Sequence, residues 1–274
     1  PQSETVWRQA DRYAVPRICF VNKLDRTGAD FYHVVDMIRE RLGANPITIQ
    51  IPWGSESNFK GMVDLLLMEA VTWADQLGSE PVRGPIPDEL KEQAEQERMK
   101  MVEAIAETDD ALMEKFLADV PPGVEEMKAA LRRATIAGLA QPVFCGSALK
   151  NKGVQTLLDG VVDYLPSPLD IPAVKGINPD TGEEEERPAS DDAPLSALVF
   201  KIVTDPYVGR LAYFRVYSGV LKAGSGVANV TKDSKERVGR VLRMFADRRE
   251  DIEEVHAGDI ATTLGLKNTF TGDT

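Results

Sequence analysis

The sequence predicts an α/β domain that is interrupted by an inserted α+β lobe and followed by an antiparallel β-barrel domain. Polar loops follow two apolar runs, residues 18–21 and 143–145, as at the carboxyl ends of strands in an open α/β sheet. Residues 46–140, which separate these runs, carry strand and helix patterns of their own. From residue 195 onward, apolar residues alternate with period two and glycines recur between short runs, a pattern typical of a small barrel.

Residues 1–45 are predicted to form part of the α/β domain. Ser3 starts a short helix that reaches about Tyr13, and a strand runs from Arg17 to Val21. The next helix has apolar residues at helical spacing and ends at Gly43; these residues are Phe31, Val34, Val35, Ile38 and Leu42.

The predicted insert, residues 46–140, opens with one strand in which Ile47, Ile49 and Ile51 alternate. Residues 59–67 and 70–73 are predicted as further strands, although the run from Leu65 to Leu67 is ambiguous, and residues 81–87 are predicted as irregular. Three helices follow, and the apolar residues assigned to their buried faces are Leu90, Ala94, Met101, Val102, Ile105, Leu112, Phe116, Leu117, Met127, Leu131, Ala134 and Leu139. We expect the insert to pack as an independent lobe.

The α/β domain is predicted to resume over residues 141–175, with a closing helix from Val154 to Leu165. The stretch from Pro166 to Pro194 is rich in Pro, Gly and acidic residues, so residues 176–194 are predicted to be a linker. Residues 195–274 are predicted to form the barrel domain, incomplete at its C-terminal end.

The composition is that of a globular protein, with 43% hydrophobic and 28% charged residues in a chain of 274 residues. No apolar stretch is long enough to cross a membrane, so no membrane association is expected. Cys19 and Cys145 lie in predicted buried strands, which favours free thiols and a cytoplasmic location. The spacing of His33 and His256 does not suggest a metal site.

The net charge of −12 is unevenly distributed along the chain. Residues 74–126 are strongly acidic, whereas residues 196–250 carry eleven bases and five acids. The basic stretch is expected to face phosphate groups. Ordinary solvated surface charge is the alternative, and for the acidic helices it has about the same weight as a functional interpretation.

The motif Asn22-Lys23-Leu24-Asp25 predicts one half of a guanine-base pocket. A carboxylate such as that of Asp25 accepts the N1 and N2 donors of guanine in a bidentate pair, and adenine would leave it desolvated and unpaired. Asn22 is expected to bridge the base and the neighbouring loop, and the alkyl stem of Lys23 to cover the flat base. The alternative is a polar strand-to-helix turn in which Asp25 only caps the helix.

Ser147 and Ala148, which follow the second apolar run, predict the other half of this pocket. The Ala148 amide is expected to donate to the guanine oxygen, and the Ser147 hydroxyl to brace Asp25. Asn151-Lys152-Gly153 lacks the Asp that would make it a second base motif, and we interpret it as a loop.

A phosphate-binding loop needs the pattern G-x-x-x-x-G-K-[ST], and this chain has no Gly-Lys pair. The residues before Asn22, about twenty, are too few for a phosphate-binding βαβ unit. We therefore expect an excised fragment with no catalytic residue and no metal ligand.

Several stretches resemble bacterial translation elongation factor G over essentially the whole chain: residues 22–30, 58–65, 147–154, 214–219, 257–260 and 271–274. The resemblance implies a truncated P-loop-GTPase-type α/β domain with its insert, followed by the second domain of a GTPase that drives ribosomal translocation of tRNA and mRNA. It implies GTP or GDP and Mg²⁺ as cofactors of the full-length parent, with none expected on the fragment. It also implies that the barrel lies on small-subunit ribosomal RNA and that the insert faces the large-subunit stalk proteins.

Two alternatives stay open. One is a sister translational GTPase, such as a tetracycline ribosomal-protection protein or a mitochondrial translocase. The other is a non-enzymatic ribosome-interaction module with a vestigial pocket.

Five arginines in the basic stretch are candidates for RNA contact: Arg237, Arg240, Arg243, Arg248 and Arg249. We expect Arg237 and Arg243 to share one face of a strand, with Arg248 and Arg249 in the following turn. In the α/β domain, the strand at residues 17–21 is expected to pair with the strand through Val143–Cys145. Its other edge is expected to be open, so that the fragment either self-associates through this edge or has a mobile N-terminal segment.

Overall fold

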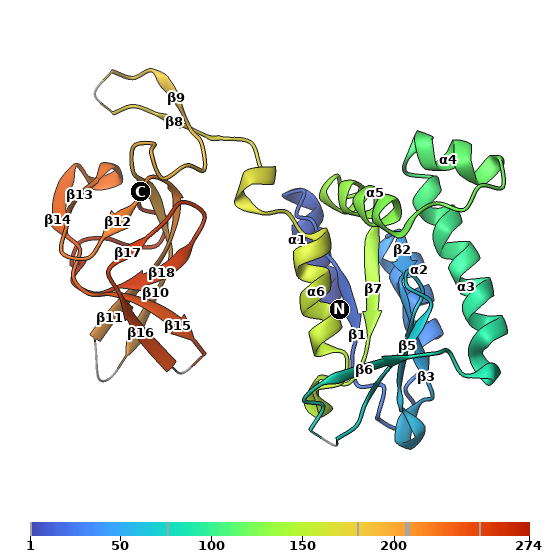
Figure 1. Cartoon of the computed structure of the whole chain (residues 1–274). Coiled ribbons are helices and arrows are strands. Elements are labelled where there is room, and N and C mark those ends of the chain that lie inside the picture. Colours follow the sequence, from blue (N-terminus) through green and yellow to red (C-terminus); the bar gives the residue numbers. More distant parts are fainter. Residues whose placement is uncertain (1, 76, 180, 206–208, 247) are drawn as a thin grey trace. The chain divides into compact units, whose positions relative to one another are not determined.

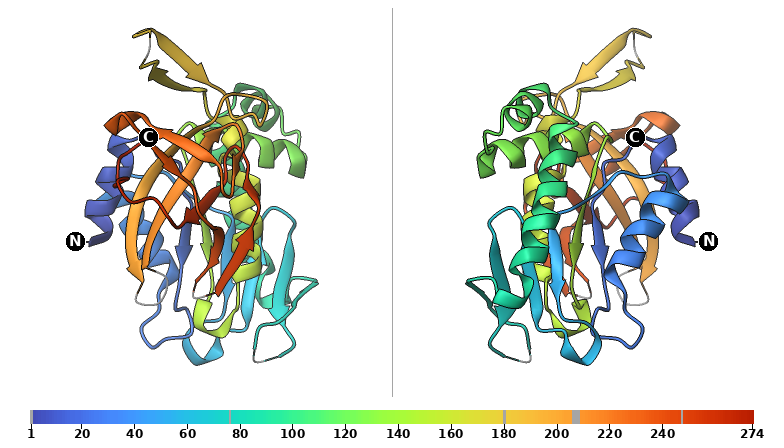
Figure 2. Two further views of the ribbon diagram at one scale, coloured as in Figure 1. Left: turned by 90° about the vertical axis from the view of Figure 1, so that its left-hand side faces the viewer. Right: turned by 90° about the vertical axis from the view of Figure 1, so that its right-hand side faces the viewer.

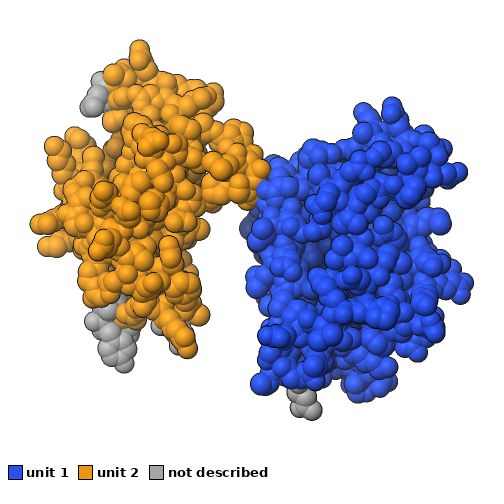
Figure 3. Space-filling model, viewed as in Figure 1, with its two compact units in different colours: residues 1–165 blue, residues 166–274 orange. Residues whose placement is uncertain are grey.

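A computed structural model describes residues 2–75, 77–179, 181–205, 209–246 and 248–274 of the chain (Figure 1). The chain divides into two compact units, residues 1–165 (unit 1) and residues 166–274 (unit 2), which Figure 3 shows in separate colours. None of the described helices has the length and apolar character that a bilayer span requires.

Unit 1 contains a three-stranded parallel sheet in the order β1-β7-β2. Its strands are β1 (Cys19–Val21), β2 (Pro46–Thr48) and the fully buried β7 (Gln141–Cys145). Cys19 pairs with Val143 and Val21 with Cys145, which confirms the predicted pairing of these two segments. Because β1 and β7 are adjacent and parallel, the loops that leave them emerge at the same edge of the sheet.

The helices that belong with this sheet are α1 (Gln2–Arg12), α2 (Phe31–Leu42) and α6 (Val154–Tyr164). The α2 boundaries match the prediction for a physical reason. Asp30 caps the start of α2 by accepting a hydrogen bond from the His33 amide at 3.0 Å. Gly43 ends it in the left-handed conformation, with φ of 63°.

The predicted single strand over Ile47, Ile49 and Ile51 is two strands in two sheets. β2 pairs with β7, whereas β3 (Gln50–Trp53) begins a four-stranded antiparallel sheet in the order β3-β4-β5-β6. One long strand and two short consecutive strands give the same period-two alternation in a sequence. The pattern over residues 47–51 therefore could not distinguish the two arrangements. One strand of the parallel sheet therefore comes from the predicted insert, whose boundaries stay a prediction.

The structure resolves one ambiguity in this sheet and overturns one prediction. The Leu65–Leu67 run is a turn between β4 (Gly61–Asp64) and β5 (Glu69–Trp73), because the Asp64 carboxylate accepts hydrogen bonds from the amides of Leu66 and Leu67. Residues 81–84, predicted as irregular, form β6 (Pro81–Gly84). As an edge strand, β6 tolerates Pro81 at its first position and has no buried residues that would produce alternation.

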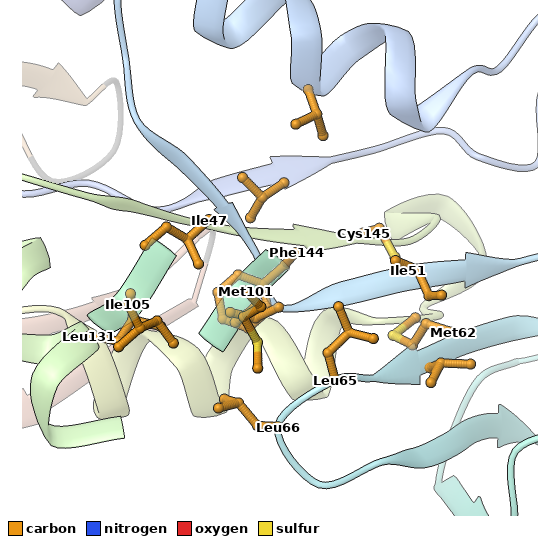
Figure 4. Close-up of a cluster of buried hydrophobic side chains, with 14 of the residues drawn as sticks. Ile47, Ile51, Met62, Leu65, Leu66, Met101, Ile105, Leu131, Phe144 and Cys145 are labelled. Atoms are coloured by element: carbon orange, nitrogen blue, oxygen red, sulfur yellow. The ribbon is translucent and has the colours of Figure 1, made fainter. Parts of the chain in front are cut away.

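Three helices complete unit 1: α3 (Asp88–Ala106), α4 (Asp110–Leu117) and α5 (Val124–Ile136). Their buried residues join those of both sheets in one hydrophobic cluster (Figure 4). Leu117 and Leu139, predicted as core, are 76% and 58% exposed because they lie at or beyond the ends of α4 and α5.

The predicted linker contains regular structure. β8 (Val174–Ile177) and β9 (Glu184–Arg187) form an antiparallel hairpin in unit 2. Lys175 forms ion pairs with Glu184 and Glu186 on the opposite strand, at 3.0 and 3.6 Å. The two strands of this hairpin lack alternating apolar residues. Their charged and turn-forming residues have the composition of a linker, which is why the sequence predicted one here.

Unit 2 is β-rich, and its main sheet has five antiparallel strands in the order β10-β11-β18-β15-β16. These strands are β10 (Ser196–Asp205), β11 (Gly209–Ser218), β15 (Val241–Phe245), β16 (Arg248–Ile252) and β18 (Ile260–Thr263). Two short ladders join β12 (Leu221–Lys222) to β17 (Glu254–Val255), and β13 (Gly226–Asn229) to β14 (Ser234–Arg237).

The closed barrel predicted for this unit is not supported. Among the described strands, β10 and β16 remain the two edges of the main sheet, and the other six strands of unit 2 pair only within two-stranded ladders. Alternation and glycine spacing predict short antiparallel strands, but they do not determine whether the last strand pairs with the first.

Candidate guanine-base site

Two loops at the carboxyl ends of β1 and β7 form the candidate site. The first loop, residues 22–28, turns sharply at Lys23, whose φ of 64° is left-handed. Leu24 is buried, and its amide donates to the carbonyl of Gly146 at 3.2 Å. The Gly146 amide donates in turn to the Val21 carbonyl at 3.0 Å. The second loop, residues 146–153, is therefore hydrogen-bonded to the first at its base.

The predicted site residues of the two loops contact one another directly. The Ser147 hydroxyl donates to Oδ1 of Asp25 at 2.6 Å, which is the bracing contact expected from the sequence. Oδ1 of Asn22 accepts from the Ala148 amide at 2.9 Å and from the Lys23 amide at 2.7 Å. Residues separated by more than a hundred positions thus form one polar cluster, while the role of this cluster in binding guanine stays a prediction.

The cluster favours the ionised form of Asp25. The hydrogen bond from Ser147 is the largest cause that lowers the pKa of this carboxyl, and the nearby ammonium of Lys150 lowers it further. Nζ of Lys150 lies 3.6 Å from Oδ2 of Asp25. An ionised carboxylate only accepts hydrogen bonds, as recognition of the two guanine donors requires.

Lys150 was not among the predicted site residues. It ends a short 3-10 helix, η2 (Ala148–Lys150), that starts directly after Ser147. This turn carries its side chain back toward Asp25. A lysine three positions after the serine of a Ser-Ala pair is too common a pattern to have identified the contact.

The Ala148 amide differs in one respect from its predicted role. It was expected to donate to the guanine oxygen, but its single hydrogen points to the Asn22 side chain. A base oxygen at this position would compete with Asn22 or share the hydrogen with it.

The second loop is closed by a pair of hydrogen bonds between Ser147 and Lys152, at 2.9 and 3.0 Å. Asn151 and Gly153 have positive φ values of 52° and 87°, so residues 151–153 form a tight turn. This agrees with their interpretation as a loop.

Magnesium ligands are not evident in the described part of the chain, where no group of three or more His, Cys, Asp or Glu side chains has a metal-binding arrangement. Cys19 and Cys145 are free thiols. Burial raises the pKa of Cys19 to about 11 and that of Cys145 even further, so neither thiol is an activated nucleophile.

Comparison with known proteins agrees with this geometry. Residues 1–167 match the family described as the elongation factor Tu GTP binding domain. The chain belongs to this family. Its members use guanine nucleotides.

The C-terminal part of the chain also matches a known family. Residues 194–274 match the family described as elongation factor G domain 2. A crystal structure of a protein from Thermus thermophilus superposes with a TM-score of 0.78 at 28% sequence identity. The match covers 98% of this chain and 37% of that chain, so the chain spans just over a third of the length of that protein.

The candidate arginines of unit 2 are placed differently from the expected arrangement, while their contact with RNA stays a prediction. Arg237 ends β14 and Arg243 lies in β15, so they do not share a strand. Arg248 and Arg249 lie in β16 rather than in a turn, because these residues pair with Phe245 and Met244 of β15.

Two of the arginines are held by carboxylates. Arg240 forms a two-pronged pair with Asp251 at 2.8 and 2.6 Å, and Arg249 pairs with Asp205 at 2.7 Å. Arg237 donates to the Gly224 carbonyl at 2.9 Å. Arg243 and Arg248 are exposed and form no ion pair with any other residue that the structure describes.

Proposed function

We propose that this chain supplies the guanine-base half of the nucleotide site in elongation factor G, a translational GTPase that moves tRNA and mRNA on the ribosome. The observation that carries the proposal is the pair of contacts Ser147–Asp25 and Ala148–Asn22, which unite the two base motifs. The matches to a translational GTP-binding domain and to elongation factor G domain 2 support it.

Asp25 is the specificity residue in this proposal. Its ionised carboxylate accepts the N1 and N2 hydrogens of guanine, with Ser147 and Lys150 fixing its orientation and charge. Adenine presents an acceptor at N1 and would leave the carboxylate unpaired, which is the strongest form of discrimination available to a binding site. The alkyl stem of Lys23 covers the base, and Asn22 links it to the second loop.

Hydrolysis is not expected from this chain. Its sequence has no Gly-Lys pair and thus no phosphate-binding loop of the usual pattern. Phosphate and metal contacts supply most of the transition-state stabilisation in phosphoryl transfer. We therefore assign GTP or GDP and Mg²⁺ to the full-length protein, with the phosphates and the metal held by residues outside this chain.

The ribosome is the proposed partner. The basic residues of unit 2 are suited to the phosphates of small-subunit ribosomal RNA, above all Arg243 and Arg248, which form no ion pair within the described part of the chain. The acidic helices of the predicted insert are proposed to face the large-subunit stalk proteins. A cytoplasmic location follows from this proposal.

We also propose that the isolated chain either self-associates through β1 or has a mobile N-terminal segment, because β1 is an edge of the three-stranded sheet among the described strands. Light scattering should show a mass that rises with concentration, or amide exchange in residues 2–21 should be faster than in the core of unit 2. A strictly monomeric chain with slow exchange in residues 2–21 would contradict this.

A titration of the purified chain with guanosine and with adenosine, followed by NMR of the Asp25 and Ala148 amides, tests the proposed function. Guanosine should shift these signals at lower concentration than adenosine, and a GTP turnover assay should give only the buffer rate with or without ribosomes. Equal response to both nucleosides would reject the base site, and measurable turnover would reject the assignment of catalysis to other parts of the protein.

A further inference from the structure

Two hairpin turns of the four-stranded sheet lie against the two loops of the base site. The turn between β3 and β4, residues 54–60, contacts the first loop, and the turn between β5 and β6 contacts the second. In an antiparallel meander these two turns lie at the same end of the sheet. Figure 2 shows them at the end of unit 1 where the chain also leaves β1 and β7.

Glu56 fixes the first loop on both sides of Asp25. Its amide donates to the carbonyl of Leu24 at 2.7 Å, and its Oε1 accepts from the amide of Gly28 at 2.6 Å. Glu56 itself has a φ of 54°, a left-handed conformation that is uncommon for residues other than glycine. Such strain persists only where several contacts determine the conformation, and it concentrates at functional sites.

Gly78 plays the corresponding part at the second loop. Its carbonyl accepts from Nδ2 of Asn151 at 2.9 Å and from Nε2 of Gln155 at 2.7 Å. A Cβ atom at Gly78 would lie 2.6 Å from the Lys150 carbonyl oxygen and 2.7 Å from that of Asn151. Only glycine permits this approach, and the φ of 63° also favours glycine.

We propose that Glu56 and Gly78 are positioning residues for recognition of the guanine base, through which the four-stranded sheet sets the distance between the two loops. The inference rests on the proposed function and deepens it. Neither residue touches the base; each holds a loop whose side chains do.

The two loops of the base site must be held accurately in position relative to each other. The Ser147–Asp25 and Ala148–Asn22 hydrogen bonds form only when both loops are in place, and each is shorter than 3 Å. A site held by rigid elements binds more tightly than one that must be ordered by its ligand. Loosening either hairpin contact should therefore weaken guanosine binding without changing any residue that contacts the base.

The test compares Glu56→Ala and Gly78→Ala with two matched controls in the same unit. Glu95→Ala makes the first change at an exposed position of α3, and Gly84→Ala makes the second in β6, where an added Cβ meets nothing within 4 Å. The readouts are amide exchange at Gly28 and Ser147 and the dissociation constant for guanosine, both by NMR.

Glu56→Ala should speed exchange at Gly28, Gly78→Ala should speed exchange at Ser147, and each should weaken guanosine binding roughly three- to tenfold. Both controls should leave binding unchanged. Glu56→Gln should recover part of the loss, because its amide oxygen still accepts from Gly28; this variant decides the matter if Glu56→Ala fails to fold.

The inference would be overturned if Glu56→Ala and Gly78→Ala bound guanosine as tightly as the wild-type chain. It would also be overturned if Glu56→Ala and Glu56→Gln both kept the wild-type affinity for guanosine and the wild-type exchange rate at Gly28. A wild-type chain that binds guanosine no better than adenosine would instead overturn the proposed function, and the inference with it. The two failures are thus distinguishable.

Discussion

Ser147 and Asp25 are 122 positions apart in the sequence, yet the serine hydroxyl donates to the aspartate carboxylate at 2.6 Å. The contact exists because β1 and β7 are adjacent parallel strands whose following loops meet at one edge of the sheet. It orients the carboxylate and lowers its pKa. The site therefore consists of two loops that neither strand could position alone.

Removal of the Ser147 hydroxyl should raise the pKa of Asp25 toward its ordinary value, since this hydrogen bond is the largest cause of the lowering. Ser147→Ala should also weaken guanosine binding by roughly tenfold. An NMR titration of the Asp25 carboxyl measures the first effect, with Ser225→Ala in unit 2 as the control. An unchanged Asp25 pKa in Ser147→Ala would contradict the assignment.

The same pKa shift predicts the sign of a pH effect. Because the folded-state pKa of Asp25 is lowered, its contacts contribute stability above the unfolded pKa of about 3.9 and lose it as the pH falls through the lower folded value. Guanosine binding should follow the same carboxylate and stay constant from neutral pH down to about pH 5. Loss of binding well above pH 5 would show that another group controls it.

Packing between α6 and β7 gives a prediction about stability. A Cβ atom at Gly160 would lie 2.0 Å from Cζ of Phe144, a ring that is only 3% exposed. Gly160→Ala should therefore destabilise unit 1 by about 1–3 kcal/mol despite the better helix propensity of alanine. The shift of the urea midpoint measures this, and Gly84→Ala, where the added methyl meets open space, should cause no comparable loss.

The arginines of unit 2 predict a graded effect on ribosome binding. Replacement of Arg243 and Arg248 by Gln in the full-length protein should weaken binding and reduce the salt slope by about one per phosphate contact. Arg240→Gln should do less, because its guanidinium is already engaged by Asp251. A double variant with an unaltered salt slope would indicate that these charges serve only solvation.

Local patterns predicted the elements that local physics determines. Asp30 and Gly43 define α2 because a cap and a left-handed glycine act within a few residues of the helix ends. The base motif was recognisable because it requires specific residue types at fixed spacing just after a strand. The polar contact between Ser147 and Asp25 followed from placing both motifs at the ends of neighbouring strands.

Features that depend on distant pairing were not predictable in this way. The division of residues 47–51 between two sheets is decided by β7 and β4, which lie elsewhere in the sequence. The closure of a barrel depends on which edges pair. Glu56 and Gly78 gave no sequence signal, since their importance comes from the Gly28 amide and the Lys150 carbonyl that they approach.

The central claim is that Asp25 reads the guanine base, and exchange of this carboxylate for an amide tests it most directly. Asp25→Asn should lose affinity for guanosine and gain affinity for xanthosine, because the amide donates to the additional xanthine carbonyl that the carboxylate repels. Parallel titrations of the wild-type chain and Asp25→Asn with both nucleosides give the answer. A reversal of preference is the predicted result, and an unchanged preference for guanosine would show that Asp25 only caps the turn that follows β1.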